Sequence, residues 1–251
     1  MHSHSLYKKH EIRCRSNTGG CFAKGTRVHT KDGLKPIEDI KVGDYVLSSP
    51  EDGSGGQEYK RVLKTFVHEQ KVIVGVQFTN VGAPSVLQGG DIYFVTTTEN
   101  HPFWVEGVGW TRADALKGGD VVRKADGSLA NVFGLKRIYR TSRDGVGWTF
   151  LGGDIKSKNR SLFWYQLGYD TYEEYFFAEE IGTLFDYANY DLTEDDGRDK
   201  YISPEVYHSE DPYLKIRVYN LEVEDFHTYY VDAQGFWVHH INCEGVHPSG
   251  G

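Results

Sequence analysis

Cys21 is the residue whose type and setting best suit covalent chemistry. It follows a Gly-Gly pair in the stretch TGGCFAKGT. A cysteine thiolate is a strong nucleophile, and beside its own preceding peptide bond it can attack the carbonyl of Gly20, exchanging an amide for a thioester. Gly20 suits the attack because it has no side chain to block the approach and tolerates strained backbone angles. The structural alternative is a small core residue, which is the commonest fate of a free cysteine.

A second pair of reactive residues lies in the stretch TTENH. Thr98 and His101 are three residues apart in an expected tight turn before Pro102, where a hydroxyl and an imidazole can converge on one peptide group. An amide is a poor leaving group, so its cleavage needs a proton donor and a polarised carbonyl. Taken alone, His101 is more simply a histidine satisfied within its own turn.

The composition predicts a β-rich fold to position these residues. Hydrophobic residues make up 39% of the 251, and the many Tyr, Phe and Trp against a single Met favour pleated sheets. Three cysteines, Cys14, Cys21 and Cys243, are too few for a disulfide framework and form no CxxC zinc motif. No apolar run is long enough for a membrane span and the start resembles no signal peptide, so we expect a soluble chain.

The acidic charge is concentrated in one segment. Residues 170–211 contain 14 Asp or Glu against only Arg198 and Lys200, which argues against nucleic-acid binding through phosphate contacts there. Within this segment the spacing over 171–188 predicts a helix, whose apolar face would consist of Phe177, Ile181, Leu184, Phe185 and Ala188.

Two stretches of the β-rich part echo each other. IEDIKVGDYVLS at 37–48 and ADALKGGDVVRK at 113–124 share a hydrophobic turn, a Lys, a Gly-Asp pair and then a β run. The echo indicates an internally duplicated β unit, with chance similarity between two strand entries as the alternative.

Three blocks of the chain together resemble the hedgehog/intein (Hint) family of self-processing domains. They are CFAKGTRV with GLKPIEDIKVGDYVLS, TTENHPFWV with ALKGGDVV, and VYNLEVEDFHTYYV with GFWVHHINC, and they cover roughly 21–50, 93–123 and 216–243. The third block is most similar to the Hint modules that precede the toxin tips of bacterial polymorphic toxins.

The resemblance implies a mainly β, horseshoe-shaped Hint fold with a partly helical acidic insert. The implied domain organisation runs in five parts. These are an N-terminal flank at 1–20, whose first residues read as a tag remnant, Hint parts at 21–139 and 213–243, the insert at 140–212, and a C-terminal flank at 244–251. The insert has no counterpart in the family blocks.

The resemblance also implies a role for each site residue. His101 would protonate the amide nitrogen that departs from Gly20, and Thr98 with nearby backbone donors would hold the scissile carbonyl. His227 matches a histidine that assists the second cleavage. Asn220 stands where many splicing inteins carry Asp, a departure that puts full splicing in question.

The C-terminal end departs from the family pattern, which finishes in Val-His-Asn. Read without a gap, GFWVHH puts His239 on the expected histidine and His240 on the expected asparagine, and imidazole cannot form a succinimide. Asn242 followed by Cys243 supplies the pair that splicing requires, although Ile241 then precedes the asparagine. Cleavage after Asn242, no efficient C-terminal cleavage, and a cut at His240 or elsewhere all stay open.

The resemblance predicts a single-turnover, autocatalytic domain that forms a thioester at Gly20–Cys21 without a cofactor and releases a C-terminal toxin. Its substrate is its own flanking polypeptide, within a larger exported or delivered bacterial protein. Full splicing through Asn242 and Cys243 is an alternative. A third possibility is an inactive scaffold that binds a protein partner, such as an immunity protein, through the acidic insert. A zinc site at Cys21, His101, His227 and His239 is a fourth.

Overall fold

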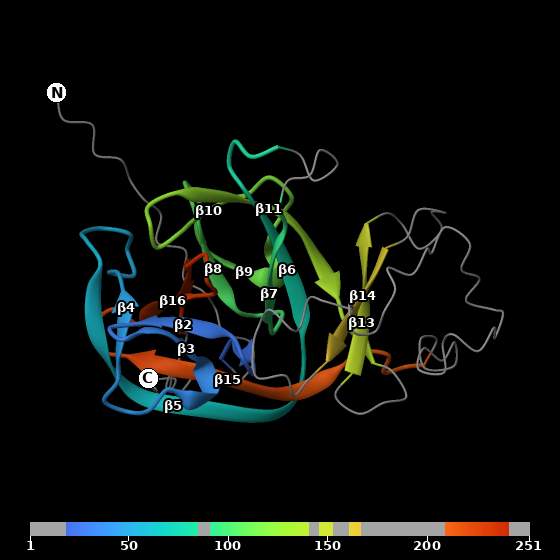
Figure 1. The fold of residues 1–251 in the computed structure, drawn as a ribbon, viewed down its shortest axis with the longest axis horizontal. Coiled ribbons are helices and arrows are strands. Elements are labelled where there is room, and N and C mark those ends of the chain that lie inside the picture. The colour runs from blue at the N-terminus through green and yellow to red at the C-terminus, as the bar shows by residue number, and fades with distance from the viewer. Residues whose placement is uncertain (1–18, 85–90, 141–145, 153–160, 167–208, 241–251) are drawn as a thin grey trace, which may run out of the picture.

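The computed structural model describes residues 19–84, 91–140, 146–152, 161–166 and 209–240, and this part of the chain is mostly β (Figure 1). The expected helix at 171–188, Cys14, Asn242 and Cys243 lie outside the described residues. The strands are β1 (Phe22–Ala23), β2 (Arg27–Thr30), β3 (Gly33–Pro36), β4 (Tyr45–Ser48), β5 (Glu58–Val72), β6 (Val74–Asn80), β7 (Tyr93–Thr97), β8 (Pro102–Val105), β9 (Gly109–Arg112), β10 (Val121–Arg123), β11 (Leu129–Arg137), β12 (Tyr139–Arg140), β13 (Val146–Gly152), β14 (Ser161–Gln166), β15 (Lys215–Val223), β16 (Thr228–Val231) and β17 (Phe236–His239).

One large antiparallel sheet carries the candidate site. Its order is β10-β11-β6-β7-β1-β15-β5-β4-β2-β16-β17-β8-β9, with β3 paired to β2. Because β10 also pairs with β8, the sheet curls back on itself. The short strand β1 lies between β7 and β15, with Phe22 opposite both Thr97 and Tyr219. Residues far apart in sequence therefore meet beside Cys21.

Two buried clusters fill the fold. The larger one lies inside the curled sheet, where β6 is buried from Val74 to Phe78. The smaller one contains Cys21 together with the apolar residues Ala23, Ile73, Phe94, Ile138, Leu214, Ile216 and Val218. The second cluster gives Cys21 the low-dielectric surroundings of a core residue.

The duplication predicted from the sequence is present in the structure. β2, β3, the 3-10 helix η1 (Ile37–Asp39), β4 and β5 follow one another in the same order as β8, β9, the 3-10 helix η3 (Ala113–Ala115), β10 and β11. Each copy contains two antiparallel hairpins separated by a helical turn. The expected internal repeat is thus a repeat of five elements.

The hydrogen bonds of the two copies match in detail. The backbone N–H of Lys41 donates to the carboxylate of Asp44 at 2.9 Å, and the N–H of Lys117 donates to that of Asp120 at 2.8 Å. This turn needs a left-handed residue before the aspartate, and the Gly in each Gly-Asp pair supplies it with φ of 96° and 92°. The shared turn chemistry explains why the sequences echo each other.

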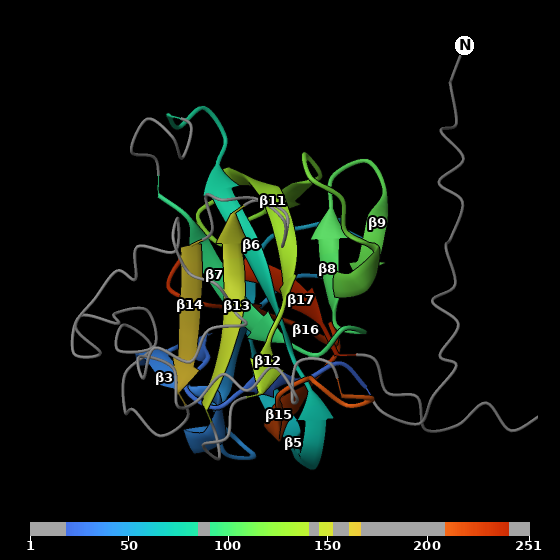
Figure 2. The same cartoon turned by 90° about the vertical axis from the view of Figure 1, so that its right-hand side faces the viewer.

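A separate three-stranded sheet, β12-β13-β14, stands beside the large one (Figure 2). Its strands lie at the start of the segment expected to be an insert, and Tyr139 on β12 pairs with Tyr213 just before β15. Among the described residues, no helix is long and apolar enough to cross a membrane.

Candidate active site at the Gly20–Cys21 peptide bond

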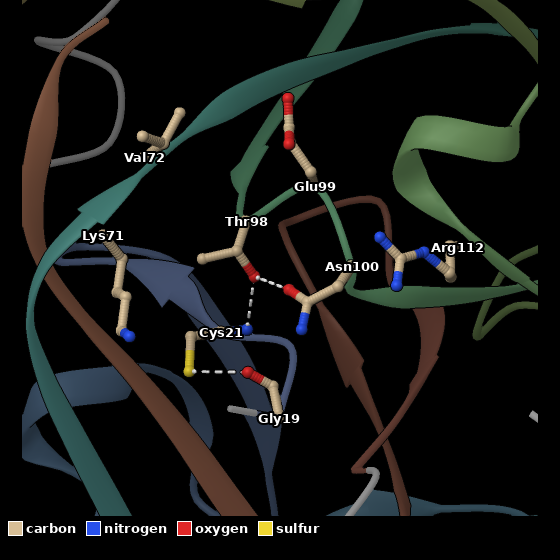
Figure 3. Close-up of a pocket in the computed structure, with 8 residues that line it drawn as sticks. All are labelled: Gly19, Cys21, Lys71, Val72, Thr98, Glu99, Asn100 and Arg112. Atoms are coloured by element: carbon tan, nitrogen blue, oxygen red, sulfur yellow. Dashed lines mark hydrogen bonds between the residues drawn. The ribbon is translucent and has the colours of Figure 1, made fainter. Parts of the chain in front are cut away.

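The Gly20–Cys21 peptide bond is hydrogen-bonded on its nitrogen side by the TTENH turn. The N–H of Cys21 donates to Thr98 Oγ1 at 2.9 Å, and that hydroxyl donates in turn to Asn100 Oδ1 at 2.7 Å (Figure 3). Thr98 therefore contacts the nitrogen that would leave. The sequence prediction assigned it to the carbonyl instead, and the difference arises because β1 pairs with β7 and brings the N–H to the hydroxyl.

The carbonyl side of the same peptide is held by Asn220. Its Nδ2 donates to the oxygen of Gly20, while its Oδ1 accepts the N–H of Leu221 at 2.7 Å and the hydroxyl of Tyr229 at 2.6 Å. These two donors fix which end of the amide faces Gly20. An aspartate at this position has no N–H to donate, so only the asparagine found here can form this hydrogen bond to the carbonyl of Gly20.

The carbonyl of Cys21 itself is also anchored. It accepts the hydroxyl of Thr97 at 2.8 Å and the N–H of Thr98 at 2.9 Å. The two threonines thus fix the residue that carries the thiol from both sides. Such preorganisation favours reaction because little reorientation is needed at the moment of attack.

His101 is fully buried against the scissile peptide. A Cβ on Gly20 would lie 2.4 Å from the Cα of His101, so only glycine fits at position 20. Its backbone is fixed by the N–H of Ala113, which donates to its carbonyl at 2.8 Å. Its ring packs on Phe22 with centroids 4.0 Å apart, and neither ring nitrogen has a hydrogen-bond partner among the described residues.

Burial lowers the pKa of His101 well below its usual value. A backbone group of Gly20 lies near the ring and raises the pKa, although its geometry falls short of a hydrogen bond, and the nearby His240 and His239 lower the pKa further. The imidazole is therefore neutral at neutral pH, with one nitrogen able to accept a proton and the other able to donate one.

The thiol of Cys21 is only 1% exposed, and its Sγ lies 3.5 Å from the carbonyl oxygen of Gly19. Burial raises the pKa of the thiol to about 12, and the positive charge of Lys71 opposes this rise. A buried cysteine in apolar surroundings is normally inert. The thiol here nevertheless borders a partly open pocket of about 220 Å³, which is lined by Gly19, Cys21, Lys71, Val72, Thr98, Glu99, Asn100 and Arg112 (Figure 3).

The two histidines at the end of β17 occupy different environments. His239 Nε2 lies 2.9 Å from a carboxylate oxygen of Glu51, and its ring packs on Trp110. His240 is buried, stacks on Phe66 with centroids 4.9 Å apart, and has no hydrogen-bond partner for its ring nitrogens among the described residues. Burial lowers the pKa of His240 to about 3, with further contributions from the neighbouring histidines.

His227 takes a less central position than the sequence suggested. Its side chain is exposed and its backbone is left-handed, with φ of 53°. Its carbonyl accepts the N–H of His240 at 2.7 Å, so its backbone anchors the end of β17. Within the described part of the chain, no group of three His, Cys, Asp or Glu side chains could hold a metal ion, so the zinc alternative has no support there.

Comparison with known proteins gives a family match and several similar solved structures. Residues 27–137 match the family model of the pretoxin HINT domain, while no curated protein matches the chain. Among solved structures, the chain is similar to a bacterial intein-like domain from Clostridium thermocellum, with 22% identity, 87% of this chain and 97% of that chain covered, and a TM-score of 0.47. It is also similar to the gp41-1 intein, with 16% identity, 88% and 99% covered, and a TM-score of 0.45. A DnaB intein from Synechocystis is 10% identical, with 88% and 99% covered and a TM-score of 0.45. The resemblance to Hint domains predicted from the sequence is confirmed, and residues 27–137 are a match to the pretoxin HINT domain.

Proposed function

We propose that this chain cleaves its own backbone at Gly20–Cys21 through an N–S acyl shift. One observation carries the proposal: both polar atoms of this peptide bond have dedicated partners, Thr98 at the nitrogen and Asn220 at the oxygen. A donor aimed at the carbonyl oxygen stabilises the negative charge that develops there during attack. The buried thiol of Cys21 is the nucleophile.

The reaction is an isomerisation that needs no co-reactant. A bond forms between Cys21 Sγ and the carbonyl carbon of Gly20, and the bond from that carbon to the nitrogen of Cys21 breaks. The proton that leaves the sulfur is balanced by the one gained by the nitrogen. A thioester and a free amine result, and an external thiol, hydroxylamine or water can then release residues 1–20.

His101 is suited to carry this proton. Because burial keeps its imidazole neutral, one ring nitrogen can accept the thiol proton and return it to the departing nitrogen. Its tight packing on Gly20 keeps it beside the bond that breaks.

The biological outcome we propose is that cleavage at Gly20–Cys21 releases a C-terminal toxin, still joined to this domain, from a larger bacterial protein. The description of the matched family as a pretoxin domain supports this cargo. Hint parts at 21–139 and 213–243, interrupted by the segment at 140–212, would form the processing unit, and its own flanks would be the substrate. His240 at the expected asparagine position favours uncoupled N-terminal cleavage over splicing through Asn242 and Cys243.

Incubation of the purified chain with hydroxylamine tests the proposal. We expect a fragment that begins at Cys21 to appear, as followed by intact mass. The Cys21→Ala variant, which lacks the nucleophile, should remain whole. Release from Cys21→Ala at the same rate, or no release from the folded unmodified chain, would refute the mechanism.

A further inference from the structure

A β-bulge interrupts strand β5 close to the candidate site. Ile216 on β15 is opposite Lys71, whereas Val218 is opposite His68, so β5 holds one residue more than its partner over this interval. Gln70, immediately before Lys71, adopts a left-handed conformation with φ of 54°. That conformation is unfavourable for a residue other than glycine, and bulges of this kind commonly redirect a side chain beside an active site.

The redirected side chain is Lys71. It lines the pocket that borders Cys21, and its ammonium group extends toward the side of the pocket that holds the sulfur (Figure 3). This ammonium group forms no hydrogen bond or ion pair with any described residue. The other charged residues of the pocket are committed elsewhere, Arg112 to Asp114 and Glu99 to Arg137.

The apolar surroundings of the sulfur mean that a nearby positive charge matters for ionisation of the Cys21 thiol. Apart from the pocket, Cys21 is packed in an apolar cluster that disfavours a negative charge. The positive charge of Lys71 lowers the pKa of the thiol and so favours its ionisation. A nearby ammonium group is one of the ordinary means by which proteins activate a cysteine.

We propose that Lys71, aimed by the bulge at Gln70, is the positioned cation that stabilises the thiolate of Cys21 for attack on Gly20. The role of the thiolate as nucleophile rests on the proposed function. The electrostatic relationship between the two side chains does not, because it can be measured without any cleavage.

Alkylation of Cys21 by iodoacetamide tests the inference on the full chain. Peptide mass mapping separates Cys21 from Cys14 and Cys243. At a fixed pH well below the pKa of the thiol, the alkylation rate follows the thiolate fraction, so a variant with a higher thiol pKa reacts more slowly. We expect Cys21 to be alkylated at least about threefold more slowly in Lys71→Met than in the unmodified chain at pH 8. In Lys71→Arg the alkylation rate of Cys21 should stay near that of the unmodified chain.

Two controls separate charge from packing. Lys136→Met removes another half-buried lysine, on β11, and should leave the alkylation rate unchanged. Added salt should slow alkylation of the unmodified chain more than that of Lys71→Met, because salt screens an attraction that only the former has. Thermal unfolding of each variant establishes that it is folded.

The outcomes distinguish this inference from the proposed function. Equal alkylation rates for Lys71→Met and the unmodified chain, or failure of Lys71→Arg to restore the rate, would overturn the role of Lys71 whatever hydroxylamine does. If Lys71→Met is alkylated more slowly but neither the unmodified chain nor any variant is cleaved by hydroxylamine, then Lys71 stabilises the thiolate and the acyl shift is refuted.

Discussion

The side-chain amide of Asn220 donates a hydrogen bond to the carbonyl oxygen of Gly20, a residue 200 positions away in the sequence. This contact joins the residue just before β1 to β15, near the other end of the described chain. The donor exists at the scissile bond only after β15 has paired with β1. The proposed activation of Gly20–Cys21 would therefore depend on completion of the fold.

Replacing Asn220 tests this link. We expect Asn220→Ala to slow hydroxylamine cleavage at Gly20–Cys21 about a hundredfold, in the range observed when one oxyanion donor is removed. Asn220→Asp should be at least as slow, because a carboxylate cannot donate and places negative charge at the carbonyl oxygen. Tyr229→Phe, which removes only the hydroxyl that orients the amide, should have a smaller effect. Rapid cleavage by Asn220→Asp would show that the carbonyl is activated by another group.

Gly20 is predicted to tolerate no side chain. In Gly20→Ala, the new Cβ would lie 2.4 Å from the Cα of His101, so either the TTENH turn or the scissile peptide must move. We expect hydroxylamine cleavage to fall at least tenfold, since a displacement of about 1 Å can cost a hundredfold in rate. Gly56→Ala is the matched control, because nothing lies within 4 Å of its new Cβ. Equal rates for the two variants would contradict close packing of His101 on Gly20.

Sequence reasoning predicted the fold well where local chemistry repeats. The Gly-Asp turns at 43–44 and 119–120 appear in the sequence as an echo because each aspartate caps the same turn. The β class followed from aromatic content. The bulge at Gln70 gave no comparable signal, because its left-handed residue is not a glycine and its register depends on β15, about 145 residues away.

The sequence predicts that Cys21, Thr98 and His101 lie close together, but it does not predict which atoms they contact. Cys21, Thr98 and His101 meet as expected because β1 pairs directly with β7. Which atom Thr98 contacts depends on the strand register, and the sequence does not specify it. The sequence marks Asn220 only as a departure from a family pattern, because its donor role depends on Leu221 and Tyr229, which fix the orientation of its amide.

The two buried histidines, His101 and His240, should make the folded state less stable at acidic pH. The folded-state pKa values of His101 and His240 are lowered, so below pH 6.5 the unfolded chain binds protons that the folded chain does not. Stability is then present above about pH 6.5 and falls as pH decreases, by about 1.4 kcal/mol per pH unit for each histidine. Urea titrations between pH 7 and pH 4 measure this slope.

His240→Phe isolates one of these contributions. Phenylalanine keeps the stacking on Phe66 and loses no hydrogen bond of the ring, since the ring nitrogens of His240 have no partner among the described residues. We expect the free energy of unfolding to depend less steeply on pH, by about one proton, between pH 6 and pH 4. An unchanged slope would mean that His240 is already accessible to protons in the folded state.

The final prediction concerns cleavage at the C-terminal end. Imidazole at position 240 cannot cyclise onto its own carbonyl, so the unmodified chain should not be cut after His240. His240→Asn places a side-chain amide beside His239, and a fragment that begins at Ile241 should then be released as the amide attacks its own carbonyl. The measurement is intact mass over several days at neutral pH, in a Cys21→Ala background that removes the N-terminal reaction.

Asn242 supplies the competing outcome. If it is the working residue, the unmodified chain releases a fragment that begins at Cys243, and Asn242→Ala abolishes that release. The two fragments differ by Ile241 and Asn242, so their masses identify the cut directly. Because His240 is buried and its N–H is bound by the carbonyl of His227, an asparagine there would be held in one backbone position beside His239. Cleavage after Asn242 in the unmodified chain, with none after position 240 in His240→Asn, would overturn the gapless alignment of the C-terminal block.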